Sequence, residues 1–275
     1  MQSRLSRRAV MAGAAALSAA ACAPRAAEAA APRIGVQLYT VRDRMAEDMA
    51  GTLEAVARIG YQEVEFAGYF DTPPAGVRQY LDDAGLQAPA AHIAFTDVRD
   101  NPELPIERAV VVEHQTLIVA WLPEEERRTL DQWRAWADRF NGFAEQCRGA
   151  GLRFAYHNHD FEFQPIDGVK PFDLLLERCD PALVDFELDL FWAVKAGEDV
   201  NAILAANPNR YPCCHVKDMA ADGSMVDVGD GRINFVDIFA RHDFAHHFVE
   251  HDNPGDSLAS ITASHAALAR ILAGN

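Results

Sequence analysis

The chain has 275 residues and a formal net charge of −16, with 41 acidic against 25 basic residues. Such an acidic surface repels nucleic acid, which argues against a nucleic-acid partner. Beyond the N-terminus, no apolar run is long enough to cross a bilayer, so we expect no membrane span.

Residues 1–29 are predicted to form a twin-arginine export signal. Arg7 and Arg8 precede a weakly hydrophobic, alanine-rich segment, and Ala27-Glu28-Ala29 offers a small-residue cleavage site. The mature protein would then be periplasmic. The alternative is cleavage before Cys22 with a lipid anchor on its thiol. Removing residues 1–29 takes away four arginines and one glutamate, which leaves 246 residues and a net charge of −19.

Residues 30–275 are predicted to be one domain, because short apolar runs alternate with amphipathic segments, as in βα units around a parallel sheet. The expected strands are 34–41, 63–67, 88–94, 116–121, 153–159, 183–190, 213–216 and 247–251. The expected helices are 49–59, 77–84, 124–150, 170–178, 200–207, 235–241 and 257–273. Eight strands alternating with helices in a body of this length predict a (β/α)8 TIM barrel.

Several local features add to this prediction. Residues 124–128, three glutamates and two arginines, are interpreted as the solvated first turn of a long helix. Residues 228–232 are expected to form a flexible loop over the site, and Ser257 is the expected N-cap of the last helix. The spacing of the four cysteines of the body matches neither a disulfide framework nor a zinc ribbon, so they are expected to be buried apolar side chains.

Three polar residues lie at the expected carboxyl ends of successive strands, where a barrel gathers its catalytic groups. They are Asp189, His215 and Glu250. Asp185 and Glu187 alternate with apolar residues before Asp189, so all three acids should face the barrel interior. Pairing with neighbouring arginines and lysines is the alternative for these acids. Carboxylates together with an imidazole are accepted by Mn²⁺, Co²⁺ or Zn²⁺, so the sequence predicts one divalent metal ion.

Six short motifs are spread over the body of the chain. They are residues 35–40 (GVQLYT), 157–159 (HNH), 188–191 (LDLF), 215–218 (HVKD), 229–231 (GDG) and 249–250 (VE). These motifs resemble the xylose-isomerase-like TIM barrels known as sugar phosphate isomerases/epimerases, from about Arg33 to the C-terminus. The resemblance implies one divalent metal held by four strand-end residues, usually Glu, Asp, His and Glu. It also implies a small-molecule carbohydrate substrate, while homo-oligomerisation stays open.

The fourth ligand position departs from the family pattern. The family glutamate on the fifth strand falls near Tyr156 or His157, and neither is acidic. Either His157 takes the position or Glu162 reaches back from the following loop. We expect His157, Asp189, His215 and Glu250 to be the metal ligands. Glu162 would then be a second acid/base or a hydroxyl-binding group.

Further roles follow from the strand positions and the resemblance. The predicted catalytic groups are Glu250, Glu162, His159 and Lys217. The Lys217 ammonium would stabilise an enolate oxygen, or else it pairs with Asp189 or Glu187. The predicted substrate-binding residues are Gln37, Tyr39, His92, Trp121 and Trp192. For the two tryptophans the alternative is core packing, and for His92 it is a hydrogen bond to a neighbour.

The sequence thus predicts a divalent-metal-dependent isomerase or epimerase that acts on a keto-sugar or sugar derivative through an enediolate. Family epimerases use two carboxylates on opposite faces of the substrate, whereas one strong carboxylate base favours isomerisation or β-elimination. The alternatives are therefore a metal-dependent lyase, dehydratase or hydrolase acting on a 3-keto-glycoside or cyclitol, and a non-catalytic sugar-binding protein. Export argues against a phosphorylated substrate.

Overall fold

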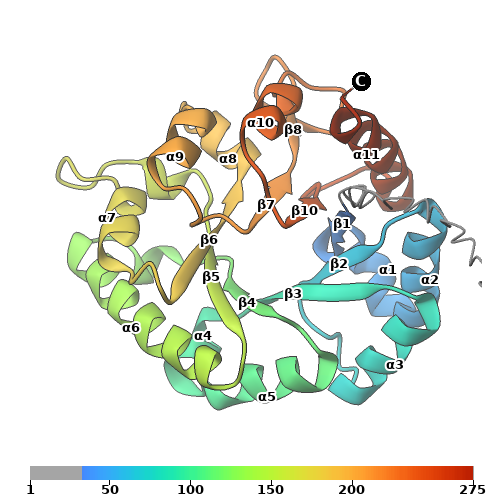
Figure 1. Cartoon of the computed structure of the whole chain (residues 1–275), viewed down its shortest axis with the longest axis horizontal. Helices are drawn as coiled ribbons and strands as arrows, with labels where there is room; N and C mark the ends of the chain where they lie inside the picture. The colour runs from blue at the N-terminus through green and yellow to red at the C-terminus, as the bar shows by residue number, and fades with distance from the viewer. Residues whose placement is uncertain (1–32, 275) are drawn as a thin grey trace, which may run out of the picture. The chain divides into compact units, whose positions relative to one another are not determined.

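The computed structural model describes residues 33–274, which contain a closed barrel of eight parallel strands (Figure 1). In chain order the strands are β1 (Ile34–Gln37), β2 (Glu63–Phe66), β3 (Gln87–Ile93), β4 (Thr116–Val119), β5 (Arg153–His157), β6 (Val184–Asp189), β7 (Cys213–Val216) and β10 (His246–Val249). Pairing of β1 with β10 closes the ring. The TIM-barrel prediction is confirmed, with a strand at each of the eight expected places. The predicted signal, the boundary near residue 30 and Cys22 lie outside the described residues.

Helices surround the ring of strands (Figure 1). They are α1 (Arg42–Glu47), α2 (Met49–Ile59), α3 (Pro74–Ala84), α4 (Phe95–Asp100), α5 (Glu103–Val112), α6 (Leu130–Gly149), α7 (Pro171–Arg178), α8 (Leu190–Lys195), α9 (Val200–Ala206), α10 (Phe235–Arg241) and α11 (Ser257–Leu272). Short 3-10 turns η1 (Leu38–Val41), η2 (Glu124–Glu126) and η3 (Phe161–Phe163) and a hairpin of β8 (Asp218–Met219) and β9 (Met225–Val226) complete the described elements. None of the described helices is long and apolar enough to cross a bilayer.

The sequence did not predict α1, α4, α5 and α8. Three of them have only six residues, which is too short for a helical period to stand out. In α5 the exposed Val110 and Val111 obscure the amphipathic pattern.

One predicted helix start and one predicted N-cap are wrong. Residues 124–126 form the separate turn η2, and α6 begins at Leu130. The cause is a capping box in which the Thr129 side chain accepts the Gln132 N–H while the Gln132 side chain accepts the Thr129 N–H. In α11 the N-cap is Asp256, whose side chain accepts the Ala259 N–H, and Ser257 is the first helical residue.

The loop of residues 228–232 is anchored by one buried carboxylate. Asp218 accepts the backbone N–H groups of Gly229 at 3.0 Å, Gly231 at 3.1 Å and Ile233 at 3.1 Å. A Cβ atom at Gly231 would collide with the Asp218 carboxylate, so this position needs glycine. We expected this loop to lie over the site. That location is wrong, because none of the residues 228–232 lines the site cavity described below.

Alternate strand residues fill the barrel interior in layers. At the amino ends of the strands, Glu63 pairs with His246 at 2.7 Å and Asp185 pairs with Arg153 at 2.6 Å. The middle layer is a small apolar cluster of Ala90, Ile118, Ala155, Cys213 and Phe248. Gly35 faces this layer, where an added Cβ would lie 2.5 Å from the Phe248 ring. Polar residues lie above it, so the apolar layer separates the site from the opposite end.

The main core lies between the strands and the helices. From α6, Phe140 packs 5.4 Å from Phe154 and 5.2 Å from Tyr156, measured between ring centroids. Burying one such side chain stabilises the fold by about 1.5–3 kcal/mol. Cysteines 147, 179, 213 and 214 are buried and free, as predicted.

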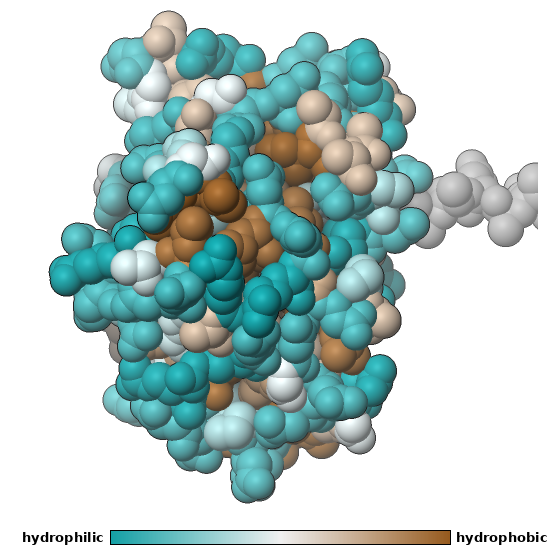
Figure 2. Space-filling model, turned by 90° about the vertical axis from the view of Figure 1, so that its left-hand side faces the viewer, coloured by the Kyte–Doolittle hydropathy of each residue, from teal (hydrophilic) through white to brown (hydrophobic). Residues whose placement is uncertain are grey.

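On the side of the molecule where α7 lies, Figure 2 shows an apolar area surrounded by hydrophilic residues.

Candidate metal centre

A cavity of about 430 Å³ opens at the carboxyl ends of the strands. Its polar and aromatic wall consists of Tyr39, His92, Trp121, His157, His159, Lys217, Glu250, Asp252 and Asn253. These side chains follow or end different strands, which is the usual origin of active-site groups in a TIM barrel.

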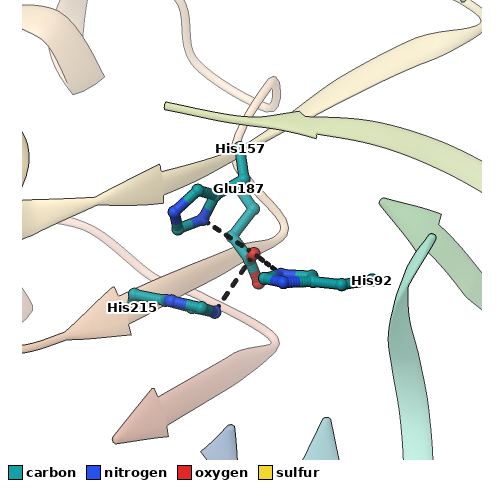
Figure 3. Close-up of side chains that lie close together, drawn as sticks. All are labelled: His92, His157, Glu187 and His215. Atoms are coloured by element: carbon teal, nitrogen blue, oxygen red, sulfur yellow. Dashed lines mark hydrogen bonds and ion pairs between the residues drawn. The ribbon is translucent and has the colours of Figure 1, made fainter. Parts of the chain in front are cut away.

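Below this cavity, three imidazoles surround the carboxylate of Glu187 (Figure 3). Glu187 Oε2 lies 2.9 Å from His92 Nε2, 3.0 Å from His157 Nδ1 and 3.1 Å from His215 Nε2. The side chain of Glu187 is fully buried. Coming from β3, β5 and β7, the three rings converge on β6 because inward residues at one level of a barrel face a common axis.

A second buried carboxylate, Glu65 on β2, contacts two of these rings at the same nitrogens that face Glu187. Its Oε2 lies 2.7 Å from His215 Nε2 and 3.1 Å from His92 Nε2. Gln37 Nε2 donates to the same oxygen at 2.6 Å. Glu65 and Glu187 therefore determine the orientation of the site histidines.

The opposite ring nitrogens face two further carboxylates. His157 Nε2 lies 3.7 Å from Asp189 Oδ2, and His215 Nδ1 lies 3.9 Å from that oxygen. His215 Nδ1 is also 2.7 Å from Glu250 Oε2. A carboxylate on one imidazole nitrogen, with the other nitrogen left for a metal, is the usual arrangement around histidine ligands.

This outer set fits one divalent cation. His157 Nε2, Asp189 Oδ2, His215 Nδ1 and Glu250 Oε2 supply two nitrogen and two oxygen donors, a set that Zn²⁺ or Mn²⁺ accepts at about 2.0–2.2 Å from each. Asp189 Oδ2 is buried, and the Lys217 ammonium lies 3.0 Å from it. The carboxylates of Asp189 and Glu250 offer ligand atoms within 4.8 Å of one another, which is costly at buried positions unless cations balance their charge.

The inner set is a second candidate. His92, His157, Glu187 and His215 bring one ligand atom each within 4.8 Å of one another, as do Asp189, His215 and Glu250. In the inner set all three imidazoles already contact one oxygen, Glu187 Oε2. Both sets reach the cavity, the inner set through His92 and His157 and the outer set through His157 and Glu250, so the nitrogens left free of Glu187 are what favour the outer set.

Lys217 contributes a buried positive charge to the outer set. Its Nζ lies 2.6 Å from Glu250 Oε2, 2.7 Å from Asp252 Oδ1 and 3.0 Å from Asp189 Oδ2. Burial disfavours the charged ammonium, but these three carboxylates outweigh it and raise the pKa of Lys217 well above its ordinary value. The sequence predicted an ion pair of Lys217 with Asp189 or Glu187, and the structure shows the pair with Asp189.

Burial and charge set the protonation of the other groups. Burial raises the pKa of Asp189 to about 6, although Lys217 and His215 favour its charged form. Glu250 is also buried, but Lys217 and His215 hold its pKa well below the ordinary value. Burial and the neighbouring Lys217 lower the pKa of His159 to about 3, so its imidazole is neutral near pH 7.

Glu162 lies beneath the cavity wall and does not line it. One oxygen accepts the Tyr156 hydroxyl at 2.7 Å, and the other accepts the His159 backbone N–H at 2.8 Å. Burial raises the pKa of Glu162 to about 8, against the effect of the Tyr156 hydrogen bond. Between the two alternatives for the fourth ligand, this geometry favours His157.

The five predicted substrate-binding residues lie at different depths. Tyr39 and Trp121 line the cavity and are 42% and 49% exposed. His92 lines it and bonds to Glu187 and Glu65. Gln37 is buried, donates a hydrogen bond to Glu65 and does not line the cavity. Trp192 does not line it either, and its ring packs 5.4 Å from that of His159.

Sequence reasoning missed the roles of Glu187, Glu65 and Asp252. It identified Glu187 only as an inward-facing acid and gave neither Glu65 nor Asp252 a role in the site. A signal for Asp252 was present, because it follows Glu250 by two residues just as Lys217 follows His215. Groups with equal offsets on neighbouring strands lie at similar depths.

Comparisons with known proteins agree with this architecture. The model of the xylose isomerase-like TIM barrel family matches residues 53–246. A sugar phosphate isomerase/epimerase from Parabacteroides distasonis ATCC 8503 is similar with a TM-score of 0.75 and 25% identity, over 88% of this chain and 95% of that one. No curated protein matches the chain.

Two further solved structures share the fold at lower identity. The IOLI protein with a binding zinc atom has a TM-score of 0.72 at 13% identity, over 88% of this chain and 98% of that one. An L-ribulose 3-epimerase has a TM-score of 0.69 at 15% identity, over 88% of this chain and 95% of that one.

Proposed function

The chain belongs to the xylose isomerase-like TIM barrel family, and from this we propose that it is a divalent-metal-dependent isomerase or epimerase acting on a keto-sugar or sugar derivative. The observation that carries the proposal is the cluster of Asp189, His215 and Glu250, whose ligand atoms lie within 4.8 Å of one another beside a cavity of about 430 Å³, with His157 Nε2 3.7 Å from Asp189 Oδ2. Similarity to a sugar phosphate isomerase/epimerase supports the reaction class.

His157, Asp189, His215 and Glu250 would hold one Mn²⁺, Co²⁺ or Zn²⁺ ion. When bound, such an ion supplies Lewis-acid polarisation of a carbonyl and the adjacent hydroxyl. The zinc of the similar IOLI protein supports a metal in this fold. Glu187 and Glu65 orient the two imidazole ligands and raise their basicity.

The protein groups around the cavity would carry the proton. Glu250, kept ionised by Lys217 and His215, is the candidate base that removes the proton between the carbonyl and the hydroxyl carbons. The Lys217 ammonium would stabilise the negative charge of the enediolate oxygens. Glu250 would then return the proton to the adjacent carbon, and the neutral imidazole of His159, on the β5 side, would bind a hydroxyl group of the substrate.

Tyr39 and Trp121 offer exposed rings at the cavity wall, on which the apolar face of a sugar would stack. We propose a positioning role for Glu162, since its two oxygens bond Tyr156 and the His159 backbone and so hold the His159 loop in place.

A lyase acting on a 3-keto-glycoside or cyclitol is the second candidate. The observation that favours it is the uneven wall of the cavity, whose carboxylates Glu250 and Asp252 both follow β10. A single basic face suits removal of one proton and loss of a neighbouring leaving group better than two-sided epimerisation.

The reaction is tested by solvent deuterium exchange. The protein loaded with Mn²⁺ is incubated in D₂O with a panel of free keto-sugars, 3-keto-glycosides and cyclitol ketones. An isomerase or epimerase incorporates deuterium beside the carbonyl of the product, and a lyase releases water or an aglycone. Thermal stabilisation by a sugar with no exchange and no product would instead identify a non-catalytic sugar-binding protein.

We also propose that residues 1–29 direct export, so the substrate would be an unphosphorylated carbohydrate. Replacing Arg7 and Arg8 with lysines should keep the protein out of the periplasmic fraction and increase its cytoplasmic fraction. An unchanged distribution between the two fractions would contradict export through this signal.

A further inference from the structure

Lys217 already binds the two oxygens that a divalent ion would need. Its Nζ lies 2.6 Å from Glu250 Oε2 and 3.0 Å from Asp189 Oδ2, and both oxygens belong to the outer ligand set. The side chains of Lys217 and Asp189 are 2% and 0% exposed, so water screens their charges little.

Two cations cannot share these oxygens without cost. A divalent ion coordinated by Asp189 and Glu250 would lie within a few ångströms of the ammonium, and like charges repel strongly at buried positions. Without Lys217, however, two buried carboxylates would face each other across His215 with less positive charge between them. The lysine therefore stabilises the metal-free site and opposes the metal.

Asp252 gives the ammonium a third partner outside the ligand set. Its Oδ1 lies 2.7 Å from Lys217 Nζ, and its side chain is 25% exposed at the cavity wall. The same ammonium can lose its contacts with Asp189 and Glu250 and still keep a carboxylate partner on the side of the cavity.

We propose that Lys217 is an exchangeable internal cation: it neutralises Asp189 and Glu250 in the metal-free protein, and on metal binding it retains Asp252 alone and faces the cavity. Asp252 is thereby a positioning residue that acts through Lys217. The inference rests on the proposed metal-dependent function. It explains how one set of buried carboxylates remains stable in both states.

The first test measures Mn²⁺ affinity by calorimetry on the full chain after chelator treatment. Lys217→Met should bind Mn²⁺ about tenfold more tightly than the wild type, because a competing charge is gone. The metal-free Lys217→Met protein should melt at a lower temperature, and added Mn²⁺ should raise its melting temperature more than that of the wild type. Lys195→Met is the matched control, since Lys195 contacts the same Trp192 ring but none of these carboxylates.

The second test is a double-mutant cycle with Asp252→Asn. In the wild-type background this change should weaken Mn²⁺ binding about threefold, because Lys217 then depends more on Asp189 and Glu250. In the Lys217→Met background it should have no effect. Equal weakening in both backgrounds would mean that Asp252 attracts the metal directly and would overturn its positioning role.

A third measurement needs no variant and remains decisive if Lys217→Met does not fold. Reductive methylation of the wild-type protein, followed by mass spectrometry, should modify Lys217 several-fold faster with Mn²⁺ than without, relative to Lys195. An unchanged or slower rate would overturn the exchange.

The outcomes separate this inference from the proposed function. Wild-type binding of Mn²⁺ with equal or weaker binding by Lys217→Met would leave the metal site intact and overturn the exchange. Binding by Lys217→Met but not by the wild type would show that the lysine excludes the ion, and it would overturn both the exchange and the metal-dependent function. Absence of Mn²⁺ binding in both proteins would overturn the proposed function and the inference together.

Discussion

The two ends of the barrel interior contain the same kinds of charged residue in opposite arrangements. At the amino ends of the strands, Glu63 pairs with His246 and Asp185 pairs with Arg153. At the carboxyl ends, acids, imidazoles and one ammonium converge, and one buried oxygen each of Glu65 and Glu187 has no hydrogen-bond partner among the described residues. A carboxylate in a one-to-one pair already has its partner. Carboxylates that gather around shared partners keep oxygen atoms available to a ligand.

Exposure to solvent explains why the charge pairs at the amino ends of the strands cost little desolvation free energy. Arg153 is 59% exposed at the side chain and His246 is 22% exposed, so their pairs with Asp185 and Glu63 stay partly hydrated. Glu187 and Asp189 are fully buried, where desolvating a carboxylate costs several kcal/mol unless partners replace the water. A fold retains such a cost where function needs it, which supports the proposal that the active site lies at the carboxyl end.

The largest expected effect comes from removing the two carboxylate ligands. Asp189→Ala combined with Glu250→Ala should abolish stoichiometric binding of divalent metal and lower deuterium exchange by about 1,000-fold or more. Metal content after dialysis and the exchange rate measure the loss. The matched control is Asp185→Asn at the opposite end, which should keep both. Full metal content in the double variant would show that the outer set is not the metal site.

Removing the carboxylate behind the imidazoles should have the next largest effect. Glu187→Gln keeps the shape but weakens the acceptor of His92, His157 and His215, so metal affinity should fall about 10–100-fold. Calorimetry with Mn²⁺ measures the change. If the affinity rises or stays the same, Glu187 does not orient the ligands.

A third prediction concerns a histidine outside the site. His114 bonds the Ala88 carbonyl and the Tyr69 hydroxyl, and burial lowers its pKa from 6.5 to about 4. Because the folded pKa lies below the unfolded one, the stability that His114 contributes is present above pH 6.5 and is lost as the pH falls towards 4. Between pH 7 and pH 5 the loss should be about 2 kcal/mol.

Urea unfolding at the two pH values checks this loss. His114→Gln should remove most of it, while His246→Gln, whose histidine has the carboxylate of Glu63 as partner, should not. An equal loss in wild type and His114→Gln would assign the acid sensitivity to other groups.

The smallest effect is expected at the paired end. Glu63→Gln should lower the free energy of unfolding by about 1 kcal/mol, because Glu63 is buried but its partner His246 stays partly exposed. It should leave Mn²⁺ affinity unchanged, because the apolar layer around Phe248 separates the pair from the site. Urea unfolding and calorimetry measure both quantities. A fall in metal affinity would mean that the two ends are coupled through the barrel.

Much of the architecture follows from local patterns. Alternation placed Glu187 and Asp189 on the inner face of β6, and the observed contacts agree with it. Boundaries were less accurate where a single side chain decides them, as Thr129 does for α6. The depth of Glu162 was not predictable, because its two hydrogen bonds depend on how the turn η3 folds back on β5.

By itself the sequence determined the number and order of the strands and the family, and it identified Asp189, His215 and Glu250 as candidate ligands, since periodicity and strand ends are local properties of the chain. Only the tertiary structure decided which nitrogens of His157 and His215 face Glu187 and which face Asp189, and that Lys217 contacts Asp252. These features depend on barrel closure, which brings Glu65 to His215 across 150 positions of sequence. Contacts between side chains so far apart are set by strand curvature and register, which no local pattern records.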